Sequence, residues 1–124
     1  MLIEEKLTGK IIKAAIEVHK ALGPGLLESA YDKCLSKEFD IIQLIYKNQV
    51  ELPIVYKGIK VDAGYRIDKI IEDKVIIELK AVEHLLSVHK AQLLTYMKLT
   101  GIRVGLLINF SVSVLKDGIK RMVL

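Results

Sequence analysis

The stretch Asp68-Lys-Ile-Ile-Glu-Asp-Lys-Val-Ile-Ile-Glu-Leu-Lys80 contains two apolar segments separated by a short polar turn. This pattern predicts a β-hairpin that turns at Glu72-Asp73. Such a hairpin sets residue 68 opposite residue 77 or 78, and facing residues have Cβ atoms about 5 Å apart. It therefore brings two carboxylates and an ammonium to one place on a sheet. Charged groups there are unfavourable unless something binds them, and a divalent metal and a phosphate would do so.

The second segment of this hairpin carries the sequence Glu78-Leu-Lys80. Side chains alternate along a strand, so Glu78 and Lys80 share one face and Leu79 points to the other. Two facing carboxylates and a backbone carbonyl suit Mg²⁺, which takes oxygen ligands and keeps waters and substrate oxygens in its shell. Lys80 would then lie beside the metal, where it can hold the attacking water or a phosphate. Taken alone, however, Glu-x-Lys is more typical of a surface salt bridge between Lys80 and one of the acids.

The remainder of the chain predicts the element order α-α-β-β-β-α-β-β. Apolar residues at helical spacing indicate two helices separated by Gly23-Pro-Gly25, and Ser87 offers the N-cap of a third. Three strands joined by short turns form an antiparallel meander, and the crossover containing the third helix makes the fourth strand parallel to the third. Pro53 suggests a sheet edge or a bulge in the first strand. The expected helices cover 7–22, 26–39 and 87–100, and the expected strands cover 49–56, 59–70, 74–81, 104–110 and 119–123.

Length and composition restrict the class of protein. The 124 residues, 52% apolar and 27% charged, predict one globular domain spanning 1–124. No apolar run approaches the ~18 residues of a membrane span, and Glu4 and Glu5 do not fit a secretory signal, so we expect a cytoplasmic protein without a membrane partner. The single Cys34 excludes an intramolecular disulfide and a cysteine-based zinc site. The net charge of +4 favours an anionic partner only modestly.

Three further features favour a functional site over a surface salt bridge. His89, Gln92 and Tyr96 follow helical spacing and form a polar stripe on the third helix, which leaves the sheet just after the Glu-x-Lys strand. Glu28 lies in the first turn of the second helix and could supply a third carboxylate, or could simply be a favourable charge at a helix start. Arg66 shares a face with Asp68, either as its ion-pair partner, which we favour, or as a phosphate contact.

The order Asp68…Glu78-Leu-Lys80…Gln92-Leu-Leu-Thr-Tyr96 resembles the PD-(D/E)XK nuclease superfamily, and its RecB-like branch in particular. Within that superfamily the chain is more closely similar to the small GxxExxR proteins. The resemblance covers essentially the whole chain. The matching segments are Leu7-Thr-Gly-Lys-Ile-Ile, Glu17-Val-His19, Leu22-Gly-Pro-Gly25, Leu27-Glu-Ser, Tyr65-Arg-Ile-Asp68, Ile77-Glu-Leu-Lys-Ala81, Ala91-Gln-Leu-Leu and Gly105-Leu-Leu-Ile-Asn-Phe110.

The resemblance implies a fold, a cofactor and a set of site residues. The fold would be α/β, restriction-endonuclease-like, with an αβββαβ core and a mixed sheet flanked by helices. The cofactor would be Mg²⁺ or Mn²⁺. The metal ligands would be Asp68 and Glu78, with Glu28 as a further acidic ligand. Lys80 would be the catalytic lysine, with Gln92 and Tyr96 as residues that support the site.

Two positions depart from the motifs of the family. Tyr31 stands where the GxxExxR name has arginine, which puts any role of that arginine in doubt. Ile67 stands before Asp68 where the superfamily name has proline.

His19 could lie near Glu28 and the site, but a helix histidine without an identified partner is more often structural.

The sequence therefore predicts a metal-dependent nuclease that hydrolyses phosphodiester bonds of nucleic acid, DNA more readily expected than RNA. One variant within this class is a homodimeric, structure-selective endonuclease resembling archaeal junction resolvases. The alternative from another class is a non-catalytic module that keeps the fold and binds a partner or nucleic acid.

Overall fold

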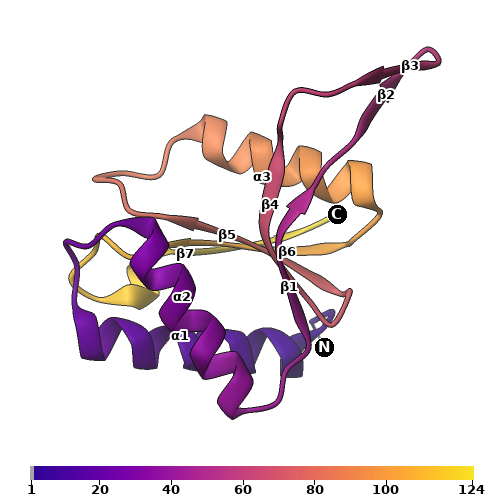
Figure 1. The fold of residues 1–124 in the computed structure, drawn as a ribbon. Coiled ribbons are helices and arrows are strands. Elements are labelled where there is room, and N and C mark those ends of the chain that lie inside the picture. The colour runs from indigo at the N-terminus through magenta and orange to yellow at the C-terminus, as the bar shows by residue number, and fades with distance from the viewer. Residues whose placement is uncertain (1) are drawn as a thin grey trace.

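The computed structural model of the chain describes residues 2–124 and contains one five-stranded sheet, one separate two-stranded hairpin and three α-helices (Figure 1). The strand order in the larger sheet is β1-β4-β5-β6-β7. The elements in chain order are α1 (Glu5–Leu22), α2 (Glu28–Ile41), β1 (Tyr46–Glu51), β2 (Ile54–Tyr56), β3 (Ile59–Val61), β4 (Arg66–Ile71), β5 (Val75–Lys80), α3 (Ser87–Thr100), β6 (Val104–Asn109), the 3-10 helix η1 (Leu115–Gly118) and β7 (Ile119–Val123). Across residues 2–124, none of the helices has the length and apolar character needed to span a membrane.

Helices cover both faces of the sheet, so the molecule has three layers (Figure 1). Alternate residues of β5 supply the two cores: Ile77 and Leu79 pack with α1 and α2, whereas Ile76 packs with α3. β5 and β6 read as nearly continuous apolar segments because both of their faces are buried. Glu78 is buried on β5 as well, and alternation places it on the α3 side of the sheet.

The predicted topology of the sheet is confirmed. β1, β4 and β5 form an antiparallel meander, and the crossover through α3 makes β6 parallel to β5. The turn between β4 and β5 falls at Glu72 and Asp73, both of which have positive φ (53° and 56°). The Lys74 N–H closes this turn by donating to Ile71 O (2.9 Å), and positive φ at both central residues matches the twist of the strands it joins. The mixed sheet with helices on both faces is the architecture that the sequence predicted.

Two of the predicted strands are wrong in their extent, because each is divided into two. The segment 49–56 covers only the end of β1, which begins earlier at Tyr46, together with β2, and the segment 59–70 covers β3 and all but the last residue of β4. Pro53 cannot donate a ladder hydrogen bond, and it lies in the gap between β1 and β2. The Leu52 N–H donates to Tyr65 O (3.0 Å) and closes the base of the loop. β2 and β3 therefore form a separate hairpin that projects from the sheet (Figure 1).

The predicted start of α3 is also wrong in its capping residue. The helix begins at Ser87, but Leu86 is the N-cap residue and no side chain caps the helix from that position. Instead, the Leu86 N–H donates to His89 Nδ1 (3.0 Å). Gly101 ends the helix in a left-handed conformation, as predicted, and its N–H donates to Met97 O (2.9 Å).

Tyr31, at the position of the arginine in the GxxExxR name, has a structural role here. Its hydroxyl donates to Gly23 O (2.5 Å) and accepts from the Leu26 N–H (3.1 Å), and its ring stacks on Phe110 at a centroid distance of 4.3 Å. The side chain is fully buried. Tyr31 thus fixes the Gly-Pro-Gly turn between α1 and α2 against the sheet.

We expect Gly118→Ala to destabilise the fold by about 1 to 3 kcal/mol, the usual range for overpacking. A Cβ at Gly118 would collide with the backbone oxygen of Asn109 at the end of β6. The matched control is Gly9→Ala in α1, where an added Cβ meets nothing within 4 Å and a helix gains about 1 kcal/mol. Urea unfolding of both variants measures the difference, and equal stability of the two would contradict this packing.

Candidate functional site

Asp68 and Glu78 face each other where β4 and β5 separate. The backbone ladder between these strands ends at the pair Lys69–Ile77. Beyond it the two carboxyl groups accept the free backbone donors: the Asp68 N–H donates to Glu78 Oε2 (2.8 Å), and the Leu79 N–H donates to Asp68 Oδ2 (2.8 Å). The predicted convergence of these two acids is therefore present in the folded chain.

Burial makes both carboxyl groups hard to ionise together. Glu78 is 4% exposed, and burial, reinforced by the charge of Asp68, raises its pKa to about 8. Burial also raises the pKa of Asp68, although the hydrogen bond from Leu79 opposes this shift. Two close carboxyls in a shielded place share protons or bind a cation in order to become charged. This pair is thus unfavourable in isolation and ready for a positive ligand.

Lys80 lies on the same strand face as Glu78, and its charge lowers the pKa of both acids. Within residues 2–124, Lys80 forms no ion pair with a carboxylate. The surface salt bridge that Glu-x-Lys suggests by itself is therefore absent from the described part of the chain. The half-buried ammonium stays near the acids and available to an anion.

The polar stripe of α3 reaches the same place. Tyr96 is 4% exposed, and burial, followed by the charge of Glu78, raises its pKa. Gln92 lies beside it, and its hydrogen bond to Tyr96 lowers that pKa. His89, the third member of the stripe, instead accepts the hydrogen bond of Leu86 at the start of the helix. Of the three stripe residues, Tyr96 thus lies near the carboxyl pair and Gln92 lies beside Tyr96.

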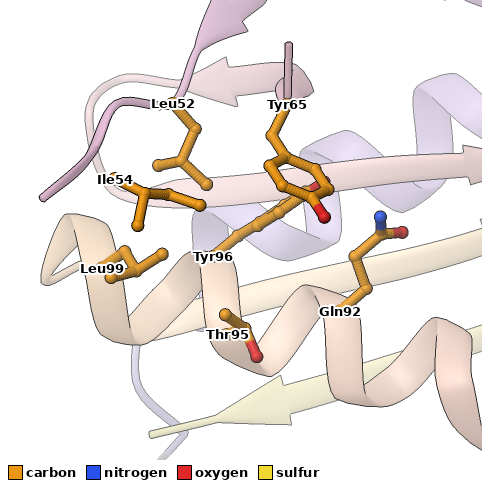
Figure 2. Close-up of a pocket in the computed structure, with 7 residues that line it drawn as sticks. All are labelled: Leu52, Ile54, Tyr65, Gln92, Thr95, Tyr96 and Leu99. Atoms are coloured by element: carbon orange, nitrogen blue, oxygen red, sulfur yellow. The ribbon is translucent and has the colours of Figure 1, made fainter. Parts of the chain in front are cut away.

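A cavity of about 260 Å³ opens next to Tyr96 and is half-enclosed by the base of the projecting hairpin (Figure 2). Figure 2 shows Tyr65 and Gln92 on opposite sides of this cavity, with the apolar side chains of Ile54 and Leu99 at its other end. The rings of Tyr65 and Tyr96 meet edge to face, with centroids 6.5 Å apart. The remaining lining residues are Leu52 and Thr95.

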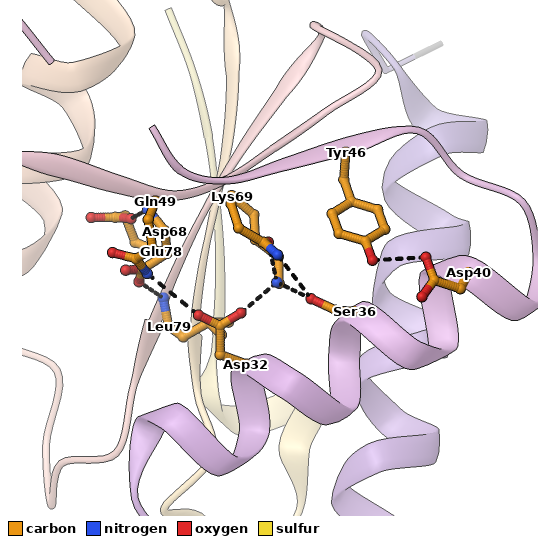
Figure 3. A network of polar contacts seen from close by, with 10 residues as sticks. Asp32, Ser36, Asp40, Tyr46, Gln49, Asp68, Lys69, Glu78 and Leu79 are labelled. Atoms are coloured by element: carbon orange, nitrogen blue, oxygen red, sulfur yellow. Dashed lines mark hydrogen bonds and ion pairs between the residues drawn. The ribbon is translucent and has the colours of Figure 1, made fainter. Parts of the chain in front are cut away.

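A buried polar network on the α2 side of the sheet supports the strand that carries Asp68 (Figure 3). Lys69 is fully buried and forms an ion pair with Asp32. Its ammonium also donates to Ser36 Oγ (2.6 Å) and Asn48 Oδ1 (2.6 Å). The charge of Asp32 contributes to the raised pKa of Asp68. The network therefore connects α2 to β4 and β1. The charge of Asp32 also acts on Asp68 from the opposite face of the sheet.

Neither Lys69 nor Asp32 was predicted from the sequence as part of the site. Lys69 occupies an apolar strand segment, where alternation alone would have assigned it to the face opposite Asp68 and hence to the core. A lysine at a buried position needs a partner, so its place in the predicted core could have prompted a search for an acidic residue that pairs with it. Asp32 lies one turn after Glu28 in α2, so a search of that helix face would have found it.

Other predicted residues lie less close to the pair. Glu28 is exposed at the first residue of α2. Within residues 2–124, no three His, Cys, Asp or Glu side chains gather closely enough to hold a metal ion, so a metal role of Glu28 stays a prediction.

The favoured interpretation of Arg66 as the ion-pair partner of Asp68 was wrong. Arg66 is exposed and makes no ion pair with Asp68 in the described residues. His19 is buried, with Nε2 2.8 Å from Val112 O, which agrees with a structural role.

The donor chemistry of the pair fits a hard divalent cation. Asp68 and Glu78 present carboxylate oxygens on adjacent strands, and burial raises the pKa of both, so a nearby positive charge would favour their ionised forms. Mg²⁺ is commonly bound by one or two carboxylates and otherwise keeps waters and substrate phosphates as ligands. Asp68 and Glu78 are therefore the residues that could hold such an ion.

We expect Lys69→Met to lower the free energy of unfolding by about 3 kcal/mol, because it leaves the largely buried carboxylate of Asp32 without its cation. Lys47→Met is the matched control, since Lys47 pairs with Asp73 at 3.2 Å and both side chains are mostly exposed. Such an exposed pair contributes less than about 1 kcal/mol. Urea unfolding measures both variants, and a small, equal effect would show that Lys69 is not an anchor.

We also expect the stability of the metal-free protein to fall between about pH 4.5 and pH 8. An ordinary glutamate has a pKa of 4.5, whereas folded Glu78 holds its proton up to about pH 8. The unfolded chain therefore loses this proton first, and folding becomes less favourable as pH rises. Glu78→Gln should raise the free energy of unfolding at pH 8 by at least about 1.4 kcal/mol, the equivalent of one pKa unit. It should also reduce the change of that free energy with pH.

The measurement is urea unfolding in EDTA at several pH values, with exposed Glu83→Gln as the control. An unchanged slope in Glu78→Gln would mean that another group titrates.

Comparison with known proteins places this arrangement in a family. The model of the PD-(D/E)XK nuclease superfamily matches residues 5–122, nearly the full length of the chain. No curated protein and no solved structure shows significant similarity to it. The matched range includes the facing acids, the adjacent lysine and the polar stripe of α3. The chain belongs to the PD-(D/E)XK nuclease superfamily.

Proposed function

We propose that this protein is a divalent-metal-dependent nuclease that hydrolyses phosphodiester bonds of nucleic acid, and that Asp68, Glu78 and Lys80 form its reactive centre. The observation that carries the proposal is the pairing of the buried carboxyl of Glu78 and the half-buried carboxyl of Asp68 with Lys80, which forms an ion pair with no carboxylate of residues 2–124. Membership of the nuclease superfamily supports the same reaction class. Within that superfamily, the motif around Glu28 supports an assignment to the GxxExxR proteins.

Each residue has a separate task in this proposal. Asp68 and Glu78 bind the cation, which is Mg²⁺ or Mn²⁺, and they become fully ionised when they do so. The bound cation supplies Lewis acidity toward the scissile phosphate and the attacking water. Lys80 holds the water or a phosphate oxygen by an ammonium that is already partly shielded from solvent, where electrostatic attraction is stronger.

Tyr96 and Gln92 support the centre from α3. Tyr96 lies near both acids, and its raised pKa keeps the hydroxyl protonated, so it can donate a hydrogen bond to a phosphate or a ligand water. Gln92 lines the adjacent cavity (Figure 2) and can hydrogen-bond without adding charge. Glu28 is a further ligand in this proposal only if α2 or the side chain moves toward the pair.

Cleavage assays test the proposed reaction. Purified protein is incubated with single-stranded, duplex and branched DNA and RNA in Mg²⁺ or Mn²⁺, and DNA is the expected substrate. Glu78→Ala and Lys80→Ala should each lower the rate by at least about 100-fold, the effect of removing one electrostatic contact to a transition state. Lys74→Ala, at an exposed position just before β5, is the matched control and should retain activity. Cleavage that is absent, or equal in wild type and both site variants, would refute the proposal.

Calorimetric titration with Mn²⁺ separates the enzyme from a non-catalytic member of the same fold. Wild type should bind the ion, and Asp68→Ala or Glu78→Ala should abolish binding because each removes one of the two ligands. Lys80→Ala should retain it. A protein that binds no metal, or binds it equally well in all variants, would favour a binding module over a nuclease.

A further inference from the structure

We propose that the hairpin β2–β3 is an arm that binds an unpaired nucleic-acid strand and leads it into the candidate site. We call residues 52–65 the arm. The inference rests on the proposed nuclease function, but it adds the binding element and the kind of strand. The arm projects away from the sheet and from α3 (Figure 1). Its middle belongs to neither of the two hydrophobic cores.

The arm exposes more apolar surface than an isolated hairpin tolerates. Val55, Tyr56 and Ile59 are 68%, 60% and 64% exposed. Two-stranded hairpins are marginally stable in water on their own, and both strands of this one have an open edge, since β2 and β3 pair only with each other. Such a surface is typical of an element that is covered by a partner.

One face of the arm continues the wall of the cavity beside the carboxyl pair. Tyr56 pairs with Ile59 and shares a face with Ile54, which lines the cavity together with Tyr65 and Tyr96 (Figure 2). Tyr56 lies four residues beyond Leu52 at the base of the arm, or about 13 Å along a strand. That distance equals about four nucleotides of a stacked strand. Aromatic rings thus lie at both ends of a path that begins at the site.

The charges of the arm indicate an anionic partner. The arm contains Lys57 and Lys60 against the single acid Asp62, so it carries +1 of the chain's net +4, and Arg66 follows directly at the start of β4. Lys57 Nζ lies 5.3 Å from the centroid of the Tyr56 ring, which places a cation directly beside an exposed aromatic surface. Stacking surfaces combined with lysines are the means by which proteins bind single strands without reading their sequence.

A second copy of the chain fits this surface less well. Lys60 is the central residue of β3, and a lysine in the middle of an edge strand opposes the addition of another strand. If the β3 strands of two copies paired symmetrically around Lys60, the two Lys60 side chains would face each other. Like charges that face each other are destabilising.

The partner strand is expected to be unpaired. Bases offer Tyr56 a free stacking face only where they are unpaired, because duplex bases already stack on one another.

Fluorescence anisotropy tests the arm without any cleavage step. Labelled single-stranded and duplex oligonucleotides are titrated in EDTA with wild type, Tyr56→Ala and Tyr56→Phe. Tyr56→Ala should weaken single-strand binding by roughly 5- to 100-fold, the effect of losing one stacked base. Tyr56→Phe should bind as wild type does, and duplex binding should change little. Equal losses on both oligonucleotides, or no loss, would overturn the proposal.

The lysines are tested by salt dependence. Lys57→Gln/Lys60→Gln should lower the slope of log affinity against log salt by about 1.4, since each phosphate contact on a single strand contributes about 0.7. Lys13→Gln/Lys20→Gln removes the same charge from exposed positions of α1, on the other side of the sheet, and should change the slope less. Equal slopes for the two double variants would overturn the proposal. So would arm variants that alter sedimentation but not nucleic-acid affinity, because the arm would then contact a second copy.

The two proposals fail in different ways. If Lys80→Ala abolishes cleavage while the arm variants bind nucleic acid normally, the nuclease stands and the arm proposal falls. If no substrate is cut but Tyr56→Ala weakens single-strand binding, the arm proposal stands and the nuclease falls. Thermal unfolding should be unchanged in the arm variants, because their side chains lie outside both cores.

Discussion

Asp68 and Glu78 connect β4 and β5 at the point where the backbone hydrogen bonds between these strands stop. Each carboxyl group accepts one of the backbone donors that the separating strands leave free, at 2.8 Å in both cases. Buried backbone donors require partners, so the acids satisfy a need of the sheet. In doing so they become close neighbours in a shielded place, which raises the pKa of both. The same two contacts therefore complete the fold locally and bring together the two carboxyl groups of the candidate site.

The rest of the molecule arranges itself around this junction from two sides. On one face, α3 brings Tyr96 and Gln92 to the acids and borders the cavity. On the other, the buried ion pair of Lys69 with Asp32 attaches α2 to the strand that carries Asp68. Adjacent residues of β4 thus serve opposite faces: one presents a carboxylate to the site, and the next anchors a helix behind it. The arm extends beyond the last pair of β1 and β4, Glu51 with Arg66, and Tyr65 at its base meets Tyr96.

Much of the candidate site could be predicted because local periodicity carries it. Alternation placed Glu78 with Lys80, but the sequence left residue 68 opposite either 77 or 78. The three-residue connection 72–74 between the paired residues Ile71 and Val75 sets residue 68 opposite residue 78. Helical spacing placed Gln92 and Tyr96 on one stripe. Periodicity did not reveal that the strands divide around Pro53, because an apolar segment looks the same whether it pairs in the main sheet or in a separate hairpin. The position of Arg66 was misjudged for a related reason, since a shared strand face does not determine where a long side chain points.

The sequence by itself determined the three helices, the mixed sheet and the hairpin that carries the acids, because these depend on short-range patterns of apolar and polar residues. Only the tertiary structure decided which long-range polar partners meet: Asp32 with Lys69, the Asp68 N–H with Glu78, and Tyr65 with Tyr96. Asp32 and Lys69 are 37 residues apart in the sequence, and their contact depends on how α2 packs on the sheet. Asp68 and Glu78 are 10 residues apart, and their contact depends on where β4 separates from β5. Burial is the physical reason for the difference. Burial brings Asp68 and Glu78 together as a carboxyl pair and makes Lys69 an internal partner of Asp32, although charged residues are usually assigned to the solvent. Burial is a property of the packed chain and not of a local sequence pattern.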